Sequence, residues 1–267
     1  MSSNKVSLNK IIIGTSAWGS KISYSNCYLI LEKLLINGFD QFDTAPNYGS
    51  GYSQNIINSV LEKKKIKVNS KFGQKMSLSL KEFFKRIYRF DNFKAFLNSN
   101  INLINYSFQN KQFWLVSNIE KNFIQIKKDL SNCLIQTFFL HSPTNAIISD
   151  KFIDEYINFC NLNKLIPGIS NVEDDLITNL ITKYKKVTFQ MSLLQYLKFE
   201  EKIEENQNMI QINSIFRSKD LQNKISKENY ERSVFEYFKN NNNIKLVLGI
   251  NSEESVKNLI KNSNFLY

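Results

Sequence analysis

Short apolar runs alternate with longer amphipathic stretches along this chain. The short runs are rich in Ile, Leu, Phe and Val and end at glycine or polar residues, which predicts buried strands. They cover residues 11–13, 39–42, 66–70, 134–140, 165–169, 187–191, 209–212 and 244–248. The stretches between them carry apolar residues at helical spacing. They predict helices over residues 23–37, 52–64, 119–132, 150–163, 173–183, 225–240 and 252–262, with a less regular pattern near 197–207.

The alternation of strand and helix predicts right-handed crossovers and a parallel sheet. Eight such units in 267 residues match a (β/α)8 barrel, or TIM barrel. The competing α/β architecture, an open doubly wound sheet, usually has a GxGxxG turn after its first strand. Here the first strand is followed by GTSAWG, residues 14–19, which lacks that spacing. We therefore expect a single barrel domain over residues 1–267.

Residues 74–118 interrupt this alternation of strands and helices. The segment is too long for an ordinary loop between a helix and a strand, and it contains helical patterns of its own. We interpret it as an enlarged third βα unit, with an insertion after the third strand near the mouth of the barrel.

The composition favours a globular protein. Hydrophobic residues make up 42% and charged residues 22%, with only 8 Gly and 3 Pro, which argues against a disordered or collagen-like chain. Three widely spaced cysteines without a CxxC pair make a disulfide framework or a zinc cluster improbable. We therefore expect no metal site and a reducing, cytoplasmic location.

The net charge of +11 would suit a nucleic acid, a membrane surface or an anionic small molecule. The lysines are spread along the whole chain, however, so we interpret the charge as compositional and expect no nucleic-acid partner. The first ten residues contain no apolar stretch typical of a signal peptide. Because no window is long and apolar enough to span a bilayer, we also expect no membrane association.

Candidate catalytic residues follow the predicted strands. In a (β/α)8 barrel, reactive groups lie at the carboxyl ends of the strands. The second strand leads into DTAPNYGSGYS with Asp43 and Tyr48, the third ends at Lys71 in SKFG, and the fourth ends at His141 in LHSP. Each residue alone has an ordinary structural explanation, such as a turn aspartate or a solvated lysine. Together they indicate a site on one rim.

This set of groups suits the reduction of a carbonyl. A phenol has a pKa near ~10 and is a weak acid at neutral pH, but a neighbouring ammonium group lowers that pKa. An aspartate keeps such a lysine charged and oriented, and a histidine can hydrogen-bond the substrate oxygen. Since no side chain donates hydride, a nicotinamide or flavin cofactor is also required.

These motifs resemble those of the aldo-keto reductase family over nearly the whole chain, and most specifically in DTAPNYGSGYS. SKFG and LHSP are similar to the family's lysine and histidine motifs. The resemblance implies that Asp43, Tyr48, Lys71 and His141 form the catalytic tetrad, that NADPH is the cofactor, and that the substrate is a small carbonyl compound. The pattern is most similar to short bacterial members that serve sugar or secondary-metabolite pathways. We expect a monomer or weak homo-oligomer.

The resemblance also implies where the cofactor contacts lie. Gly14 and Thr15 would be near it, and a second group would hold the nicotinamide carboxamide, namely Ser170, Asn171 and Gln190. Phe216 and Arg217, in INSIFRS, would lie along the pyrophosphate. The adenosine end would be held by residues of the eighth strand's loop and helix, namely Gly249, Asn251, Ser252 and Asn258.

Some positions depart from the family pattern. Asn251 replaces an arginine that many short relatives use for the 2′-phosphate, and Glu253 and Glu254 follow it, so we expect a modest preference for NADPH with NADH usable. Because the chain ends at Tyr267, we expect no long carboxyl-terminal loop. The candidate residues for the substrate pocket are the aromatics Trp18, Tyr52 and Trp114. An alternative function is a nucleotide-binding sensor or regulatory protein on the same fold with little turnover, against which the complete tetrad argues.

Overall fold

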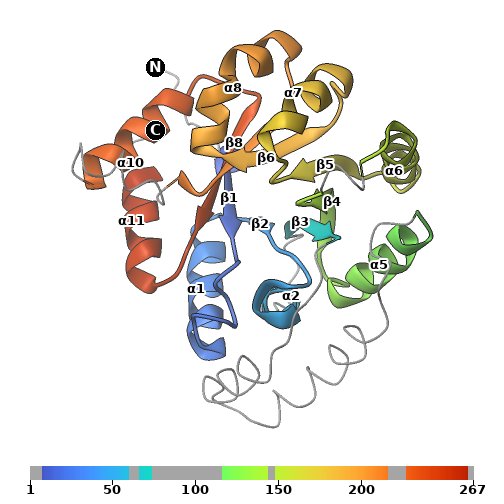
Figure 1. Ribbon diagram of the computed structural model, residues 1–267. Coiled ribbons are helices and arrows are strands. Elements are labelled where there is room, and N and C mark those ends of the chain that lie inside the picture. The colour runs from blue at the N-terminus through green and yellow to red at the C-terminus, as the bar shows by residue number, and fades with distance from the viewer. Residues whose placement is uncertain (1–7, 60–65, 74–115, 144–147, 216–226, 264–267) are drawn as a thin grey trace.

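The computed structural model describes residues 8–59, 66–73, 116–143, 148–215 and 227–263. These residues contain eight parallel strands that pair in chain order and close into a barrel, with the last strand against the first (Figure 1). The strands are β1 (Ile11–Gly14), β2 (Gln41–Asp43), β3 (Lys67–Phe72), β4 (Leu134–His141), β5 (Ile166–Ser170), β6 (Thr188–Ser192), β7 (Ile210–Asn213) and β8 (Ile244–Gly249). The predicted (β/α)8 fold is confirmed.

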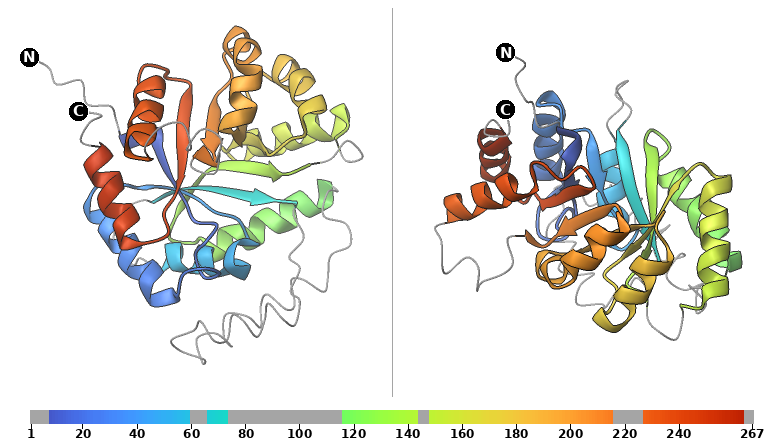
Figure 2. Two further views of the ribbon diagram at one scale, coloured as in Figure 1. Left: turned by 60° about the vertical axis from the view of Figure 1, so that its left-hand side comes forward. Right: turned by 90° about the horizontal axis from the view of Figure 1, so that it is seen from above.

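Helices surround this ring (Figure 2). They are α1 (Tyr24–Ile36), α2 (Tyr52–Asn58), α5 (Val116–Asp129), α6 (Asp150–Leu162), α7 (Asp174–Lys183), α8 (Leu193–Asn206), α10 (Lys227–Phe238) and α11 (Glu253–Ser263), with the short 3-10 helices η1 (Leu8–Lys10) and η2 (Tyr48–Gly51). No helix within the described ranges is long and apolar enough to cross a membrane.

Several helix boundaries differ from the sequence prediction: α5 was expected over 119–132, α2 was expected to continue to residue 64, and α8 begins earlier than expected. The weakly patterned helix near 197–207 is α8, which begins at Leu193, directly after β6. Ser192 is its cap, because the hydroxyl of Ser192 accepts a 3.2 Å hydrogen bond from the backbone N–H of Gln195. A serine that also ends a strand gives no separate start signal in the sequence, so the first turn of the helix was missed.

The predicted insertion falls almost wholly outside the described residues, which omit residues 74–115. Its last three positions, 116–118, belong to α5. The interpretation of the remainder as an enlarged third unit stays a prediction.

The barrel interior is packed below the site by aromatic residues. Phe139 of β4 is fully buried, and a Cβ on Gly168 of the neighbouring β5 would lie 2.4 Å from its ring. Glycine at position 168 therefore makes room for this ring. The ring of Phe139 in turn lies 5.4 Å from the Nζ atom of Lys71. Burying an aromatic of this kind stabilises the fold by about 1.5–3 kcal/mol and provides an apolar floor beneath the charged groups.

Candidate active site

Asp43 and Lys71 meet at the carboxyl ends of adjacent strands. Asp43 is the last residue of β2, and the Lys71 ammonium forms an ion pair and hydrogen bond with its Oδ1 atom. The side chain of Lys71 is fully buried and that of Asp43 is 5% exposed. Burial lowers the pKa of Lys71 below its ordinary value, and the neighbouring carboxylate opposes that change. The carboxylate thus supports a positive charge where water cannot reach it.

Tyr48 and His141 complete the group. Tyr48 begins η2, is half-buried, and its ring centre lies 5.6 Å from the Nζ of Lys71. The ring of His141, at the end of β4, lies 6.0 Å from that of Tyr48 at an interplanar angle of 86°. Desolvation by burial, helped by the charge of Lys71, lowers the pKa of His141 to about 3. His141 is therefore neutral at physiological pH and acts as a hydrogen-bonding group.

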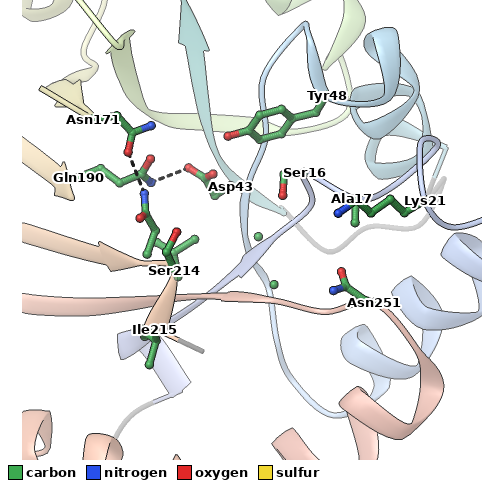
Figure 3. A pocket seen from close by; sticks show the side chains of 14 residues that line it. Ser16, Ala17, Lys21, Asp43, Tyr48, Asn171, Gln190, Ser214, Ile215 and Asn251 are labelled. Atoms are coloured by element: carbon green, nitrogen blue, oxygen red, sulfur yellow. Dashed lines mark hydrogen bonds between the residues drawn. The ribbon is translucent and has the colours of Figure 1, made fainter. Parts of the chain in front are cut away.

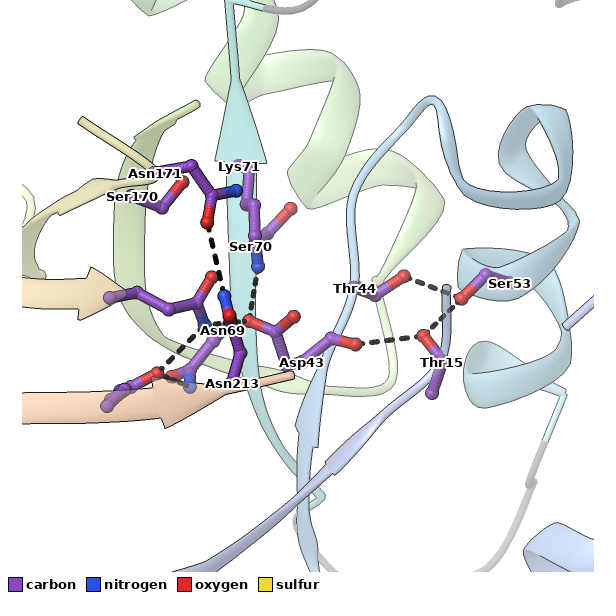
Figure 4. Close-up of polar contacts among 12 residues, drawn as sticks. Thr15, Asp43, Thr44, Ser53, Asn69, Ser70, Lys71, Ser170, Asn171 and Asn213 are labelled. Carbon is purple, nitrogen blue, oxygen red and sulfur yellow. Dashed lines mark hydrogen bonds and ion pairs between the residues drawn. The ribbon is translucent and has the colours of Figure 1, made fainter. Parts of the chain in front are cut away.

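Hydroxyl groups fix the loop that carries Tyr48 (Figure 4). The hydroxyl of Thr15, in the turn after β1, donates a 2.9 Å hydrogen bond to the backbone carbonyl of Asp43. The hydroxyl of Ser53, in α2, is hydrogen-bonded to those of Thr15 and Thr44. All three hydroxyl residues are fully buried. The loop is therefore held from both ends, which fixes the position of Tyr48 between them.

The same loop makes a close contact with the turn after β1. Gly49 has a φ of +53°, and a Cβ there would lie 2.1 Å from the carbonyl oxygen of Trp18. Only glycine fits this position. The indole of Trp18 donates a 2.9 Å hydrogen bond to the carbonyl of Ile250, which follows β8. Trp18 therefore joins the loops that follow the first and last strands.

A cavity of about 590 Å³ opens above Tyr48 and Asp43 (Figure 3). The loops after β1, β2, β5, β7 and β8 contribute to its wall, together with Gln190 of β6. Five of the predicted cofactor residues lie on it: Gly14, Asn171, Gln190, Gly249 and Asn251. Its volume suits a small-molecule ligand or part of a dinucleotide. Asp43 and Tyr48 thus share this wall with the predicted cofactor contacts, while Lys71 and His141 are buried and do not line it.

Other predicted residues lie away from this cavity wall. Thr15 and Ser170 are fully buried behind it. Ser252 caps α11, since its hydroxyl accepts a 3.1 Å hydrogen bond from the backbone N–H of Ser255. Asn258 is exposed on α11. Phe216, Arg217 and Trp114 lie outside the described residues.

The structure does not bring the two described candidates for the substrate pocket to the cavity. The side chains of Trp18 and Tyr52 are 0% and 1% exposed and belong to the hydrophobic core. Aromatic residues in a loop near a site give the same sequence signal whether they line a pocket or pack beneath it.

Sequence reasoning missed several residues on the cavity wall. Lys21, in the loop after β1, is exposed and is the one cation on the described part of the wall. Its side chain extends past Ala17, with the amine toward the side of the cavity that holds Ser16 and Asn251 (Figure 3). Position in a loop after a barrel strand was the only signal that could have indicated Lys21, and many residues share it.

Comparisons with known proteins agree with this geometry. The model of the aldo/keto reductase family matches residues 10–248 of the chain. None of the curated proteins matches it. Similar solved structures include the holo form of aldo-keto reductase AKR11C1 from Bacillus halodurans, with a TM-score of 0.69, 15% identity, and coverage of 95% of this chain and 86% of that one.

Two further structures are also similar. An aldo-keto reductase from Klebsiella pneumoniae in complex with NADPH has a TM-score of 0.63 and 11% identity, with coverage of 96% of this chain and 85% of that one. The glycerol dehydrogenase AKR11B4 from Gluconobacter oxydans has a TM-score of 0.63 and 15% identity, with coverage of 96% and 90%. At these identities the likeness shows the shared fold.

Proposed function

The chain belongs to the aldo/keto reductase family, whose members are NAD(P)H-dependent carbonyl reductases, and on that premise we propose that it uses NADPH to reduce a small aldehyde or ketone to an alcohol. The observation that supports the proposal is the buried Lys71 ammonium, which is paired with Asp43 and lies 5.6 Å from the ring centre of Tyr48, with Asp43 and Tyr48 both lining the cavity.

In this proposal Tyr48 is the proton donor. A nicotinamide supplies hydride to the carbonyl carbon when it is bound. The substrate's carbonyl oxygen, as it becomes negatively charged, accepts the phenolic proton of Tyr48. The Lys71 ammonium stabilises the phenolate that remains. Neutral His141 hydrogen-bonds the same oxygen and orients it. Asp43 keeps Lys71 charged and does not exchange a proton with the substrate.

The chemistry of the cavity wall fits the cofactor. Amide side chains at the Tyr48 end, Asn171 and Gln190, can pair with the carboxamide of a nicotinamide. At the far side, the ammonium of Lys21 and the amide of Asn251 can contact a phosphate. Glu253, which would repel a phosphate, forms an ion pair with Lys33 that offsets its charge. We propose NADPH as the preferred cofactor on this basis.

The described wall also suits a polar substrate. Apart from the tetrad residues, its side chains are mostly amides and hydroxyls, of which Asn213 and Ser214 are not assigned to the cofactor, while Trp18 and Tyr52 are packed in the core. Such groups pair with the hydroxyls of a sugar-like carbonyl compound better than with an apolar ring.

The test is single-turnover oxidation of bound NADPH by a reactive aldehyde, followed by the loss of nicotinamide absorbance. We expect turnover with the wild-type protein and almost none with Tyr48→Phe. Tight binding of NADPH without oxidation by any of a panel of aldehydes would instead support a sensor or regulatory protein. Absence of both binding and turnover would refute both functions.

A further inference from the structure

Three buried amide side chains connect Asp43 to the opposite wall of the barrel. The Nε2 atom of Gln190 in β6 lies 2.9 Å from Oδ1 of Asp43 and 3.3 Å from Oε1 of Gln211 in β7. That same oxygen of Gln211 accepts a 3.0 Å hydrogen bond from Nδ2 of Asn69 in β3. All three amide side chains are at most 5% exposed, so no solvent competes for these contacts.

The chemistry of Asp43 sets the direction of this network. A carboxylate only accepts hydrogen bonds, so Gln190 must turn its NH2 group toward Asp43. The second proton of that NH2 group then needs another acceptor, which is the carbonyl oxygen of Gln211. A reversed Gln211 would place its own NH2 group against the NH2 groups of Asn69 and Gln190. Each amide therefore has one favourable orientation.

This orientation determines what Gln190 offers to a ligand. Gln190 lies on the cavity wall, and its nitrogen is engaged below by Asp43 and Gln211. The carbonyl oxygen of Gln190 is thus the polar atom that remains for the cavity. In Figure 3 the nitrogen of this side chain is the atom joined to Asp43.

We propose that Gln211 is a positioning residue, which holds the amide of Gln190 so that the cavity receives a hydrogen-bond acceptor and Asp43 receives a donor. The ligand group that such an acceptor selects is an N–H or O–H donor. The identification of that donor with the NH2 of a nicotinamide carboxamide rests on the proposed function. Without Gln211, Gln190 keeps its contact with Asp43 but loses the second of the two contacts that oppose its reversal. Its amide is then held less firmly, and its carbonyl oxygen is presented to the ligand's donor for less of the time.

A cofactor analogue tests this role. We compare the dissociation constants of NADP+ and its 3-acetylpyridine analogue, whose methyl ketone has no NH2 group, for wild type and Gln211→Met. We expect the variant to bind NADP+ about 3–10-fold more weakly, the effect of one neutral hydrogen bond, and to bind the analogue as well as wild type does. Equal weakening toward both ligands would mean that Gln211 is merely structural and would overturn the proposal.

Gln41→Met is the matched control. Gln41 is also a buried glutamine of the barrel, 5% exposed, but it lies at the amino end of β2. There it donates a 3.0 Å hydrogen bond to the carbonyl of Asn9 and accepts one of 3.0 Å from Lys245. We expect this variant to lose stability while keeping the wild-type ratio of NADP+ to analogue affinity. A changed ratio in Gln41→Met would show that the ratio reports general loosening of the barrel and would count against the proposal.

A second measurement needs no cofactor. Exchange of the side-chain amide protons of Gln190 with water is followed by NMR, the signals being assigned by their loss in Gln190→Met. We expect both protons to be protected in wild type and Gln41→Met, and one to lose protection in Gln211→Met. Should Gln211→Met fail to fold, Gln211→Glu, which keeps both acceptor contacts, is expected to keep both protons protected. Unprotected amide protons of Gln190 in wild type, or no effect of Gln211→Met on their exchange, would overturn the proposal. This measurement does not depend on cofactor binding. A protein that binds no NADP+ but shows the expected exchange would refute only the proposed function.

Discussion

The ammonium group of Lys71 contacts the carboxylate of Asp43 in an ion pair whose side chains are 0% and 5% exposed. In such a pair each charge offsets part of the other's cost of dehydration, and removing one partner leaves the other as an uncompensated buried charge. The pair lies at the junction of β2 and β3, so the proposed catalytic role and a structural requirement fall on the same two residues.

The stability of this pair gives a first prediction. Asp43→Asn removes the charge that compensates Lys71, and we expect a loss of about 3–5 kcal/mol in the free energy of unfolding. The double variant Asp43→Asn/Lys71→Met has no isolated charge and should recover part of that loss. Chemical denaturation of both variants checks this, and a double variant less stable than the single one would contradict it.

The assignment of the proton donor gives a second prediction. Tyr48→Phe removes the phenolic hydroxyl and leaves the ring, so we expect kcat to fall by roughly 10²–10⁴-fold, as is usual for loss of a general acid. The dissociation constant of NADPH should stay near the wild-type value. A variant that keeps more than about a tenth of the wild-type kcat would show that another group donates the proton.

Burial of His141 predicts a pH-dependent stability. Its pKa falls from the ordinary 6.5 to about 3 in the folded protein, so the unfolded chain binds the extra proton between these values. Stability from this group is complete above pH 6.5 and declines as the pH falls toward 3. Between pH 6.5 and pH 5 the decline is roughly 2 kcal/mol, at about 1.4 kcal/mol per pH unit.

Denaturation of wild type and His141→Gln at pH 7 and pH 5 measures this effect. The variant, which has no group to titrate in that range, should lose less stability between the two pH values than wild type does. Equal losses would show that folding does not lower the pKa of His141. The same low pKa also predicts that turnover has no limb near pH 6.5 caused by His141.

Cofactor choice depends on the cations at the far side of the cavity. With Asn251 in place of an arginine and Lys21 as the described cation, we expect NADPH to bind better than NADH by about tenfold, which corresponds to ~1.4 kcal/mol. Lys21→Met should reduce this ratio, while Lys151→Met, on α6, should not. Fluorescence titration with both reduced cofactors at one ionic strength provides the constants. A ratio above roughly 100-fold would require a further cation, with Arg217 and Lys219 as the first candidates.

The sequence indicated the four residues of the proposed tetrad because each lies at or soon after the carboxyl end of a strand whose apolar run is easy to recognise. It did not indicate Gln211, because a polar residue between two isoleucines of β7 is equally consistent with a strand edge or an exposed face. Nor could the sequence separate Trp18, which packs in the core, from Lys21, which reaches the cavity. Both lie in one loop, and the direction of each side chain depends on contacts with loops from elsewhere in the chain.

The hydrogen bond from the indole of Trp18 to the carbonyl of Ile250 spans 232 positions of the chain. β1 also pairs with β8, so the barrel can close only after the eighth strand has been made. During synthesis on the ribosome, a nascent chain that ends before β8 can hold Asp43, Tyr48, Lys71 and His141 but lacks Gly249 and Asn251 on the cavity wall. The candidate reactive groups are therefore translated well before part of the wall that encloses them, and the complete cavity arises only after β8 and its loop have been translated.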